Sequence, residues 1–320
     1  MVSPQLYRRA IPAAARITRW TAPDGWALRR FDWPANGPAR GRMLFQGGRG
    51  DIFEKYLEAF AHWQAQGWSI TSFDWRGQGG SGRLSPNPHV GHVDDFQLYI
   101  DVFRAFWAEW RAERAAGTGG PHVAIGHSMG GHLLLRALVE GAAEPDAAVL
   151  VAPMLGLHSP LGATLGERLA VLLGGIGDAA RPAWRGNEKP ATTETRQALL
   201  THDQDRYEDE LFWQASKPDL LLGPPSWRWV IEAFRSTRRL RADSRLKTLS
   251  VPLLFVVPEN DQLVAPKAAY GVAAKLPDAQ VARFGVESAH EILREVDAVR
   301  NRALGAIDGF LAARAPGPRA

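Results

Sequence analysis

The pentapeptide Gly-His-Ser-Met-Gly at positions 126–130 constrains the fold of this 320-residue chain more than any other stretch. It reads G-x-S-x-G, and its two flanks differ in character. The apolar, β-branched run before it, at 122–125, predicts a buried strand. The Leu- and Ala-rich run after it, at 129–139, predicts a helix. A serine on a sharp turn between a strand and a helix has a strained backbone, and its hydroxyl is lifted above the edge of the sheet.

This turn predicts a role for each of its members. Side chains at Gly126 and Gly130 would collide with the neighbouring strand and helix, so both positions need glycine. The backbone N–H of Met129 lies at the helix N-terminus, where it can bind a developing oxyanion. We therefore predict that Ser128 is a nucleophile. A chance G-x-S-x-G is common in glycine-rich chains, but the strand–turn–helix context argues against one here.

The remainder of the chain predicts an α/β fold. Strands and helices alternate from residue 42 onward, which is typical of a mostly parallel, doubly wound sheet with helices on both faces. Two alternating segments before it, 16–20 and 26–31, are joined around Asp24-Gly25 and predict an antiparallel hairpin. The other predicted strands are 42–46, 68–73, 147–151, 252–257 and 279–284, and the other predicted helices are 53–66, 96–115, 267–276 and 292–314.

The alternation breaks at residues 158–247. This segment is rich in helical patterns with Gly and Pro between them, and it offers no clear strand. It follows the strand that comes after the nucleophile, so we expect a helical cap over the C-terminal ends of the strands, where ligands bind in open α/β sheets. The expected division is a core of 1–157 and 248–320 with a cap of 158–247. The alternative is an insertion that does not touch the site.

A serine hydroxyl needs a base to take its proton, and that base needs an acid to fix its tautomer. In folds with this turn, the chain order is nucleophile, acid, histidine. Four histidines follow Ser128. His132 lies on the helix that the serine starts, and His158 and His202 fall in the predicted cap. His290 comes directly after the last strand, so we predict that it is the base. The alternative is an ordinary histidine in a surface loop.

The acid is expected just beyond a strand. Asp261 follows the strand at 252–257 and is the predicted acid, with Glu259 in reserve. A helix N-cap is the alternative role for Asp261. The strand at 147–151 is followed by Ala-Pro-Met, which contains no acid.

A second oxyanion donor is expected in the loop after the strand at 42–46. Gly47 and Gly48 open that loop, and we assign the donor to the backbone N–H of Arg49. Loss of one such donor typically lowers the rate by ~10²–10³. The alternative is a glycine-rich turn with no catalytic role.

Several other chemistries are not indicated. The chain has no cysteine, which excludes disulfides, thiolate catalysis and Cys-ligated zinc. No His, Asp and Glu cluster has metal-ligand spacing, so neither a metal nor an organic cofactor is expected. The G-x-G-x-x-G match at 77–82 is followed by the proline-rich stretch 84–88, which prevents the helix that a dinucleotide site needs. We treat Arg49-Gly50-Asp51, an adhesion-type tripeptide, as coincidence. A net charge of +4 does not indicate nucleic-acid binding.

The expected location is the cytoplasm. Residues 1–20 are interrupted by Arg8, Arg9, Pro12 and Arg16, so we expect no signal peptide, and no apolar run is long enough to cross a bilayer. The apolar stretch 161–176 could line an acyl tunnel, make peripheral contact with a membrane, or pack on the core as an ordinary helix. Basic residues at 235–247 could meet lipid phosphates, and a solvated helix face is the alternative.

With those residues in place, the chain resembles the α/β-hydrolase superfamily and, within it, the group of monoacylglycerol lipases and bacterial lysophospholipases. Many monoacylglycerol lipases have His-Gly where Gly47-Gly48 stands, and this difference favours the bacterial branch. Segments 200–207 and 223–230 also resemble that branch. The motifs that carry the resemblance are Asp74-Trp75-Arg76-Gly77-Gln78-Gly79 with Ser81-Gly82-Arg83, Gly91-His92-Val93, the serine pentapeptide, Ala152-Pro153-Met154, Asp261, and Ala289-His290-Glu291-Ile292-Leu293.

The resemblance implies a serine hydrolase that cleaves the acyl ester of a lysophospholipid or a monoglyceride through an acyl-enzyme. Ser128, Asp261 and His290 would form the triad. Two alternatives stay open on the same fold: hydrolysis of short non-lipid esters or of amides, as in related aminopeptidases, and a receptor that binds a ligand without cleaving it. The partner is expected to be a small ester or a single-chain lipid, and the sequence leaves the oligomeric state open.

Overall fold

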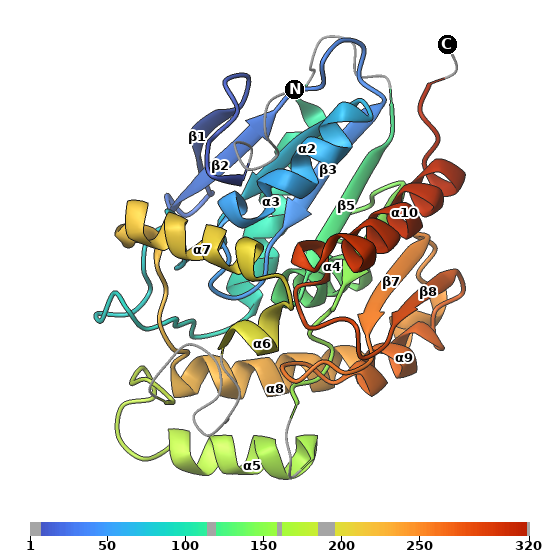
Figure 1. Cartoon of the computed structure of the whole chain (residues 1–320). Coiled ribbons are helices and arrows are strands. Elements are labelled where there is room, and N and C mark those ends of the chain that lie inside the picture. The colour runs from blue at the N-terminus through green and yellow to red at the C-terminus, as the bar shows by residue number, and fades with distance from the viewer. Residues whose placement is uncertain (1–7, 114–119, 159–161, 185–195, 319–320) are drawn as a thin grey trace.

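The computed structural model describes residues 8–113, 120–158, 162–184 and 196–318. Within them, eight strands form one sheet in the order β1-β2-β4-β3-β5-β6-β7-β8 (Figure 1). The strands are β1 (Arg16–Thr21), β2 (Ala27–Trp33), β3 (Gly41–Gln46), β4 (Trp68–Phe73), β5 (His122–His127), β6 (Ala147–Val151), β7 (Leu253–Pro258) and β8 (Ala279–Phe284).

Strand direction confirms the predicted sheet. β1 pairs with β2 antiparallel across the Asp24-Gly25 turn, and β2 pairs antiparallel with β4. All later neighbours pair in parallel. Because parallel strands end at the same edge, the loops after β3, β5, β6 and β7 meet at one rim of the sheet.

Side chains alternate between two apolar layers, as a doubly wound sheet requires. In β5, Val123 and Ile125 belong to the layer that α2 (Leu57–Ala65) and α10 (Asp297–Arg314) cover. Ala124 belongs to the opposite layer, with α3 (Gln97–Ala112) and α4 (Met129–Val139). A smaller helix, α9 (Pro266–Ala273), joins this second layer (Figure 1).

Helix α3 shows how the sequence pattern sets the packing. Tyr99, Phe103, Phe106 and Trp110 recur at helical spacing and are all buried. The ring of Phe106 lies 4.5 Å from that of Phe73 on β4. Burial of each such side chain contributes about 1.5–3 kcal/mol, so this stripe alone fixes α3 against the sheet.

Two predicted helices are each divided in the structure, and residues 114–115 of the predicted helix at 96–115 lie outside the described residues. The predicted helix at 53–66 begins with a separate 3₁₀ turn, Phe53–Tyr56, before α2, and this tighter turn buries all four of its residues. The predicted helix at 292–314 is divided into a 3₁₀ turn, Ile292–Arg294, and α10. The division falls at Glu295, whose buried carboxylate turns back to accept the N–H of Ala289 at 2.8 Å.

The chain between β6 and β7 carries α5 (Ala163–Gly174), α6 (Arg196–Leu200), α7 (Gln204–Ser216) and α8 (Trp227–Ala242), with 3₁₀ turns at Pro218–Leu220 and Ser244–Thr248. In its described part we find isolated bridges but no strand. Helix α8 is anchored to the core: the ring of Trp229 lies 5.6 Å from that of Phe96. The predicted cap limits, 158 and 247, stay a prediction.

Part of the apolar stretch at 161–176 falls outside the described residues; the rest forms α5 and the turn after it. None of the helices that the structure describes has the length and apolar character to cross a membrane.

Candidate active site

Ser128 occupies the strained turn between β5 and α4. Its φ of 53° and ψ of −117° lie in a region that non-glycine residues rarely adopt. The turn is held open by its glycines. A Cβ added to Gly126 would lie 2.6 Å from the carbonyl oxygen of Gly130, and one added to Gly130 would lie 2.4 Å from that of Gln46. The N–H of Met129 is at the first position of α4, where no preceding helical turn can accept from it.

The structure brings Ser128, His290 and Asp261 together. Nε2 of His290 lies 2.9 Å from Oγ of Ser128, and Nδ1 lies 2.6 Å from Oδ2 of Asp261. An ionised carboxylate can only accept, so Nδ1 carries the proton and Nε2 accepts from the serine hydroxyl. Both His290 and Asp261 are buried. This is the geometry in which an imidazole can take the serine proton.

The rejected candidates lie elsewhere. His132 is fully buried and contacts Ser236 on α8 at 2.8 Å, and burial lowers its pKa to about 3. His202 pairs with Glu295 at 3.0 Å. Glu259, the reserve acid, accepts instead from the hydroxyl of Tyr270 at 2.8 Å. His158 lines the same pocket as Ser128 but is exposed.

The loop after β3 packs directly against Ser128. A Cβ on Gly48 would lie 2.9 Å from Cβ of Ser128, so only glycine allows this approach. The Arg49 side chain donates to the carbonyl of Gly223 at 2.9 Å and stacks over the ring of Trp229 at 5.5 Å. We call residues 47–51 the oxyanion loop. The role of the Arg49 N–H as oxyanion donor stays a prediction.

Two side chains hold the oxyanion loop in place. Asp51 accepts the N–H of Gly48 at 2.6 Å through Oδ2. Gln78 donates to the carbonyl of Gly48 at 2.8 Å and accepts the N–H of Gly50 at 3.2 Å. Gln78 belongs to the glycine-rich segment that formally matches a dinucleotide motif, and in the structure it holds the loop beside Ser128.

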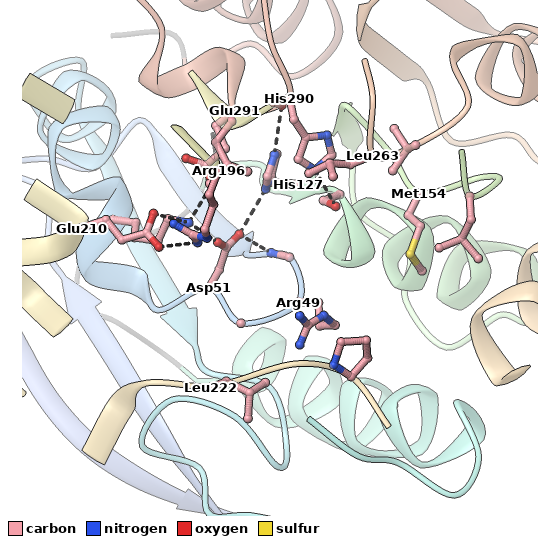
Figure 2. Close-up of a pocket in the computed structure, with 18 of the residues that line it drawn as sticks. Arg49, Asp51, His127, Met154, Arg196, Glu210, Leu222, Leu263, His290 and Glu291 are labelled. Atoms are coloured by element: carbon pink, nitrogen blue, oxygen red, sulfur yellow. Dashed lines mark hydrogen bonds and ion pairs between the residues drawn. The ribbon is translucent and has the colours of Figure 1, made fainter. Parts of the chain in front are cut away.

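A pocket of about 1000 Å³, open mouth included, lies over Ser128. Figure 2 shows Asp51, Glu210 and Glu291 on one side of it and Met154 and Leu263 on the other. Polar side chains of the lining are Asp51, Lys55, Arg196, Glu210, Gln214 and Glu291, which we call the charged wall. Apolar side chains of the lining are Met154, Leu157, Trp184, Leu200, Leu221, Leu222, Pro225, Trp229, Leu263 and Val264, which we call the apolar wall. Arg49 also lines the pocket and belongs to neither set.

The charged wall centres on five buried groups that we call the Lys55 cluster: Asp51, Lys55, Glu210, Glu291 and Arg294. Burial alone would lower the pKa of Lys55, but the Asp51, Glu210 and Glu291 carboxylates hold it above its ordinary value. Burial raises the pKa of Glu210, whereas Lys55, Arg196 and Arg294 together bring it down to about 2. These groups therefore all stay ionised at neutral pH.

Little in the sequence indicates this cluster. Lys55 falls in the predicted helix at 53–66, and Asp51 stands four residues earlier, in the loop before that helix. On a helix this spacing usually marks a solvent-exposed ion pair. Only the fold brings Glu210 and Glu291 to the same ammonium. Among the described residues, no group of three or more His, Asp or Glu side chains has an arrangement that could hold a metal ion.

Comparison with known proteins places the chain among hydrolases. A family model described as serine aminopeptidase, S33, matches residues 37–297. Lysophospholipase L2 of Escherichia coli strain K12 is 30% identical over 274 residues, which cover 82% of this chain and 78% of that protein. The probable lysophospholipase L2 of Haemophilus influenzae is 26% identical over 272 residues, which cover 84% and 83%.

Solved structures show the same fold. A soluble variant of monoglyceride lipase from Saccharomyces cerevisiae aligns with a TM-score of 0.74 at 20% identity and covers 95% of this chain and 97% of that one. The monoacylglycerol lipase of Paleococcus ferrophilus aligns with a TM-score of 0.67 at 18% identity and covers 89% and 98%.

Proposed function

The chain belongs to the α/β-hydrolase family described as serine aminopeptidase S33 and is a serine ester hydrolase of its lysophospholipase and monoglyceride lipase group; we propose that Ser128, His290 and Asp261 carry the reaction on a single-chain lipid ester. The observation that carries this proposal is the contact between Oγ of Ser128 and Nε2 of His290 at 2.9 Å, with Asp261 on the far nitrogen of the ring.

The first half-reaction forms an acyl-enzyme. Oγ of Ser128 attacks the acyl carbonyl while Nε2 of His290 takes its proton, a contribution of typically ~10²–10⁴ to the rate. The carboxylate of Asp261 holds the imidazole in the required tautomer and stabilises its cation. The N–H groups of Met129 and Arg49 receive the negative charge that develops on the carbonyl oxygen.

Release of the alcohol completes the acyl-enzyme, and a second half-reaction with water then restores the free enzyme. His290 gives its proton to the oxygen of the departing alcohol, which leaves as glycerol or a glycerophospho compound. A water molecule then takes the place of the alcohol, loses a proton to His290 and attacks the acyl carbonyl. Collapse of the second tetrahedral intermediate releases the fatty acid, and the proton returns to Ser128.

The two walls of the pocket support an amphipathic substrate. An acyl chain on the apolar wall gains about 0.8 kcal/mol for each buried CH₂. The charged wall, which is fully paired within the protein, suits the polar alcohol part of the ester. Ser128 lines the same pocket as both walls, which suits a substrate with its ester between a chain and a head group.

The direct test uses the purified protein with lysophosphatidylcholine, a monoglyceride, and p-nitrophenyl esters from acetyl to palmitoyl. We expect kcat/KM to rise with chain length and Ser128→Ala to abolish turnover of every ester. A fluorophosphonate probe should label the wild-type protein and leave Ser128→Ala unlabelled. Wild-type rates that equal those of Ser128→Ala would refute the proposal.

The family description also names an aminopeptidase, so amide hydrolysis is the rival activity. An aminopeptidase site needs a carboxylate for the substrate's α-ammonium. Here Glu210 and Glu291 already bind Lys55 and Arg294, which favours the ester. Turnover of aminoacyl p-nitroanilides without turnover of lysolipid would reverse this choice.

We also propose that helix α5 makes peripheral contact with an anionic membrane surface. Leu165, Leu172 and Leu173 are exposed on α5, and Ile176 is exposed in the turn after it; Leu172 is 64% and Ile176 63% exposed. Helix α8 packs beside α5 and carries two exposed arginines, Arg238, which pairs with Glu167 on α5, and Arg239. Such cations suit anionic lipid head groups. An apolar helix face flanked by arginines is typical of segments that lie in the bilayer interface.

Sedimentation with vesicles tests this contact. Vesicles of phosphatidylcholine with phosphatidylglycerol should bind the protein more tightly than phosphatidylcholine alone. A Leu172→Ser/Ile176→Ser variant should bind at least about tenfold more weakly. Val286→Ser is the matched control, because Val286 is 80% exposed in the loop between β8 and α10. Equal binding by the double variant and the wild type would contradict the proposal.

A further inference from the structure

The buried ammonium of Lys55 contacts carboxylates from three separate segments. Its Nζ lies 2.6 Å from Asp51 in the oxyanion loop, 2.6 Å from Glu291 and 3.1 Å from Glu210 on α7. Glu291 is the residue that follows His290, and α7 belongs to the insertion between β6 and β7. One cation therefore joins both catalytic loops to a helix of the predicted cap.

The contact with Asp51 acts on the oxyanion loop. Lys55 binds Oδ1 of Asp51, while Oδ2 accepts the N–H of Gly48 at 2.6 Å and the hydroxyl of Tyr56 at 2.6 Å. Oδ2 also lies 3.1 Å from Nδ1 of His127, which precedes the nucleophile. The orientation of the Asp51 carboxylate thus sets how the loop approaches Ser128.

The contact with Glu291 acts on the His290 loop. The N–H of Glu291 donates to the carbonyl of Leu200 on α6 at 2.7 Å, and its side chain binds Lys55 and Arg294. Both the main chain and the side chain of Glu291 are therefore held by hydrogen bonds. Because the residue next to the base cannot shift without breaking one of these bonds, His290 is held at its distance from Ser128.

The contact with Glu210 brings in the cap. Glu210 on α7 is shared by Lys55, Arg196 and Arg294. Three buried carboxylates repel one another unless cations lie between them. If α7 moved away, the Lys55 ammonium would keep only Asp51 and Glu291 as partners. The positions of both carboxylates would then change.

We propose that Lys55 is a positioning residue, which sets the orientation of the oxyanion loop and of the His290 loop and makes both depend on the docking of α7. This inference rests on the ester hydrolysis proposed above. Lys55 touches no reacting atom. It acts through Asp51 and Glu291, because preorganised donors and a fixed base are worth most when they are in place before the substrate arrives.

The test compares Lys55→Met and Lys55→Arg with Lys217→Met. Lys217 is a matched control, because its ammonium also joins the α7 region to the 3₁₀ turn before α2, through Glu54 at 3.0 Å, and it does not line the pocket. With a p-nitrophenyl ester, Lys55→Met should lower kcat by about 10²–10³ with KM nearly unchanged. The rate of fluorophosphonate labelling should fall in parallel, Lys55→Arg should recover much of the loss, and Lys217→Met should match the wild type.

Glu210→Gln supplies the second measurement, since it weakens the link to the cap and leaves Lys55 paired with Asp51 and Glu291. Its kcat should fall by about three- to tenfold, and its effect should be non-additive with Lys55→Met. An active wild type with a folded Lys55→Met of unchanged kcat would overturn the inference and leave the hydrolase function standing. If Lys55→Met does not fold, an unchanged kcat in Glu210→Gln overturns it. An inactive, unlabelled wild type would instead refute the function itself.

Discussion

Asp261 and His290 are joined by only one oxygen of the carboxylate. Oδ2 of Asp261 lies 2.6 Å from Nδ1 of His290, while Oδ1 accepts the N–H groups of Leu263 and Val264 at 2.8 and 3.0 Å. The two backbone donors fix which oxygen faces the imidazole. The carboxylate therefore presents a pure acceptor to the ring and cannot rotate away from it.

This arrangement makes Asp261→Asn a defined perturbation. The amide oxygen would keep the two backbone N–H groups, so the amide nitrogen would face His290 and donate to Nδ1. The imidazole proton would then move to Nε2, where it blocks acceptance from Ser128. We expect kcat to fall by about 10⁴ with little change in melting temperature, measured with p-nitrophenyl butyrate and by circular dichroism.

Glu259→Gln is the control for the choice of acid. Its carboxylate binds Tyr270 and Arg283, away from the imidazole, so kcat should stay within about twofold of wild type. A large loss in Glu259→Gln together with an active Asp261→Asn would show that the wrong acid has been assigned.

The glycines of the serine turn predict a contrast in stability. Gly126→Ala would place its methyl 2.6 Å from a backbone carbonyl, and overpacking of this kind costs about 1–3 kcal/mol. Gly305→Ala meets nothing within 4 Å on the exposed side of α10 and should stabilise by about 0.5–1 kcal/mol. Urea denaturation would measure both, and equal effects of the two substitutions would contradict the predicted crowding at the turn.

The depressed pKa of Glu210 predicts a particular response to acid. The ordinary pKa of a glutamate is 4.5, whereas the pKa of Glu210 in the folded protein is about 2. Its contribution to stability is therefore complete above pH 4.5 and is lost as the pH falls through 2. Glu210→Gln should flatten the acid limb of the plot of unfolding free energy against pH by up to about 1.4 kcal/mol per pH unit.

Denaturant titrations across that pH range would measure the slope. Glu208→Gln, on the exposed side of the same helix, should leave it unchanged. An acid limb for Glu210→Gln that runs parallel to that of the wild type would show that the buried cations do not hold this carboxylate ionised.

The apolar wall predicts a change in chain-length preference. Leu157→Trp would fill part of that wall and exclude the end of a long acyl chain. Because each CH₂ left unburied loses about 0.8 kcal/mol, kcat/KM for the dodecanoyl ester should fall by about tenfold or more, while the butyryl ester should change little. Leu157→Ala is the matched control, and a uniform loss across all chain lengths would place the acyl chain elsewhere.

The sheet and the elements around it were predictable because their signals are local. The apolar run before Ser128, the glycines beside it and the aromatic spacing of α3 each determine a structure within a few residues. Chain order then placed His290 and Asp261 at the rim where Ser128 lies, since parallel strands end on one edge. The fold and the family can be predicted from these local patterns and from the chain order. The structure adds the distances between Ser128, His290 and Asp261.

The charged wall was not predictable for the opposite reason. The role of Lys55 depends on its ion pairs with Glu210 and Glu291. These residues are 155 and 236 positions away along the chain, in segments with no sequence pattern that links them to Lys55. The predicted helix at 53–66 includes Lys55, and nothing in its local pattern indicates that the ammonium is buried. The 3₁₀ turn that buries it depends on tertiary pairing, which outweighs helix propensity.

The bonds from α6 to the histidine loop have a consequence for protein engineering. The carbonyls of Leu199 and Leu200 accept the N–H groups of His290 and Glu291, so this part of the insertion is joined by main-chain hydrogen bonds to the segment that holds His290. A chimera that exchanged the insertion for one from a relative would also replace the residues whose carbonyls bind the main chain of His290 and Glu291. Transplants that aim to alter substrate choice in this chain should therefore keep 196–200 with the histidine loop and exchange only what lies outside them.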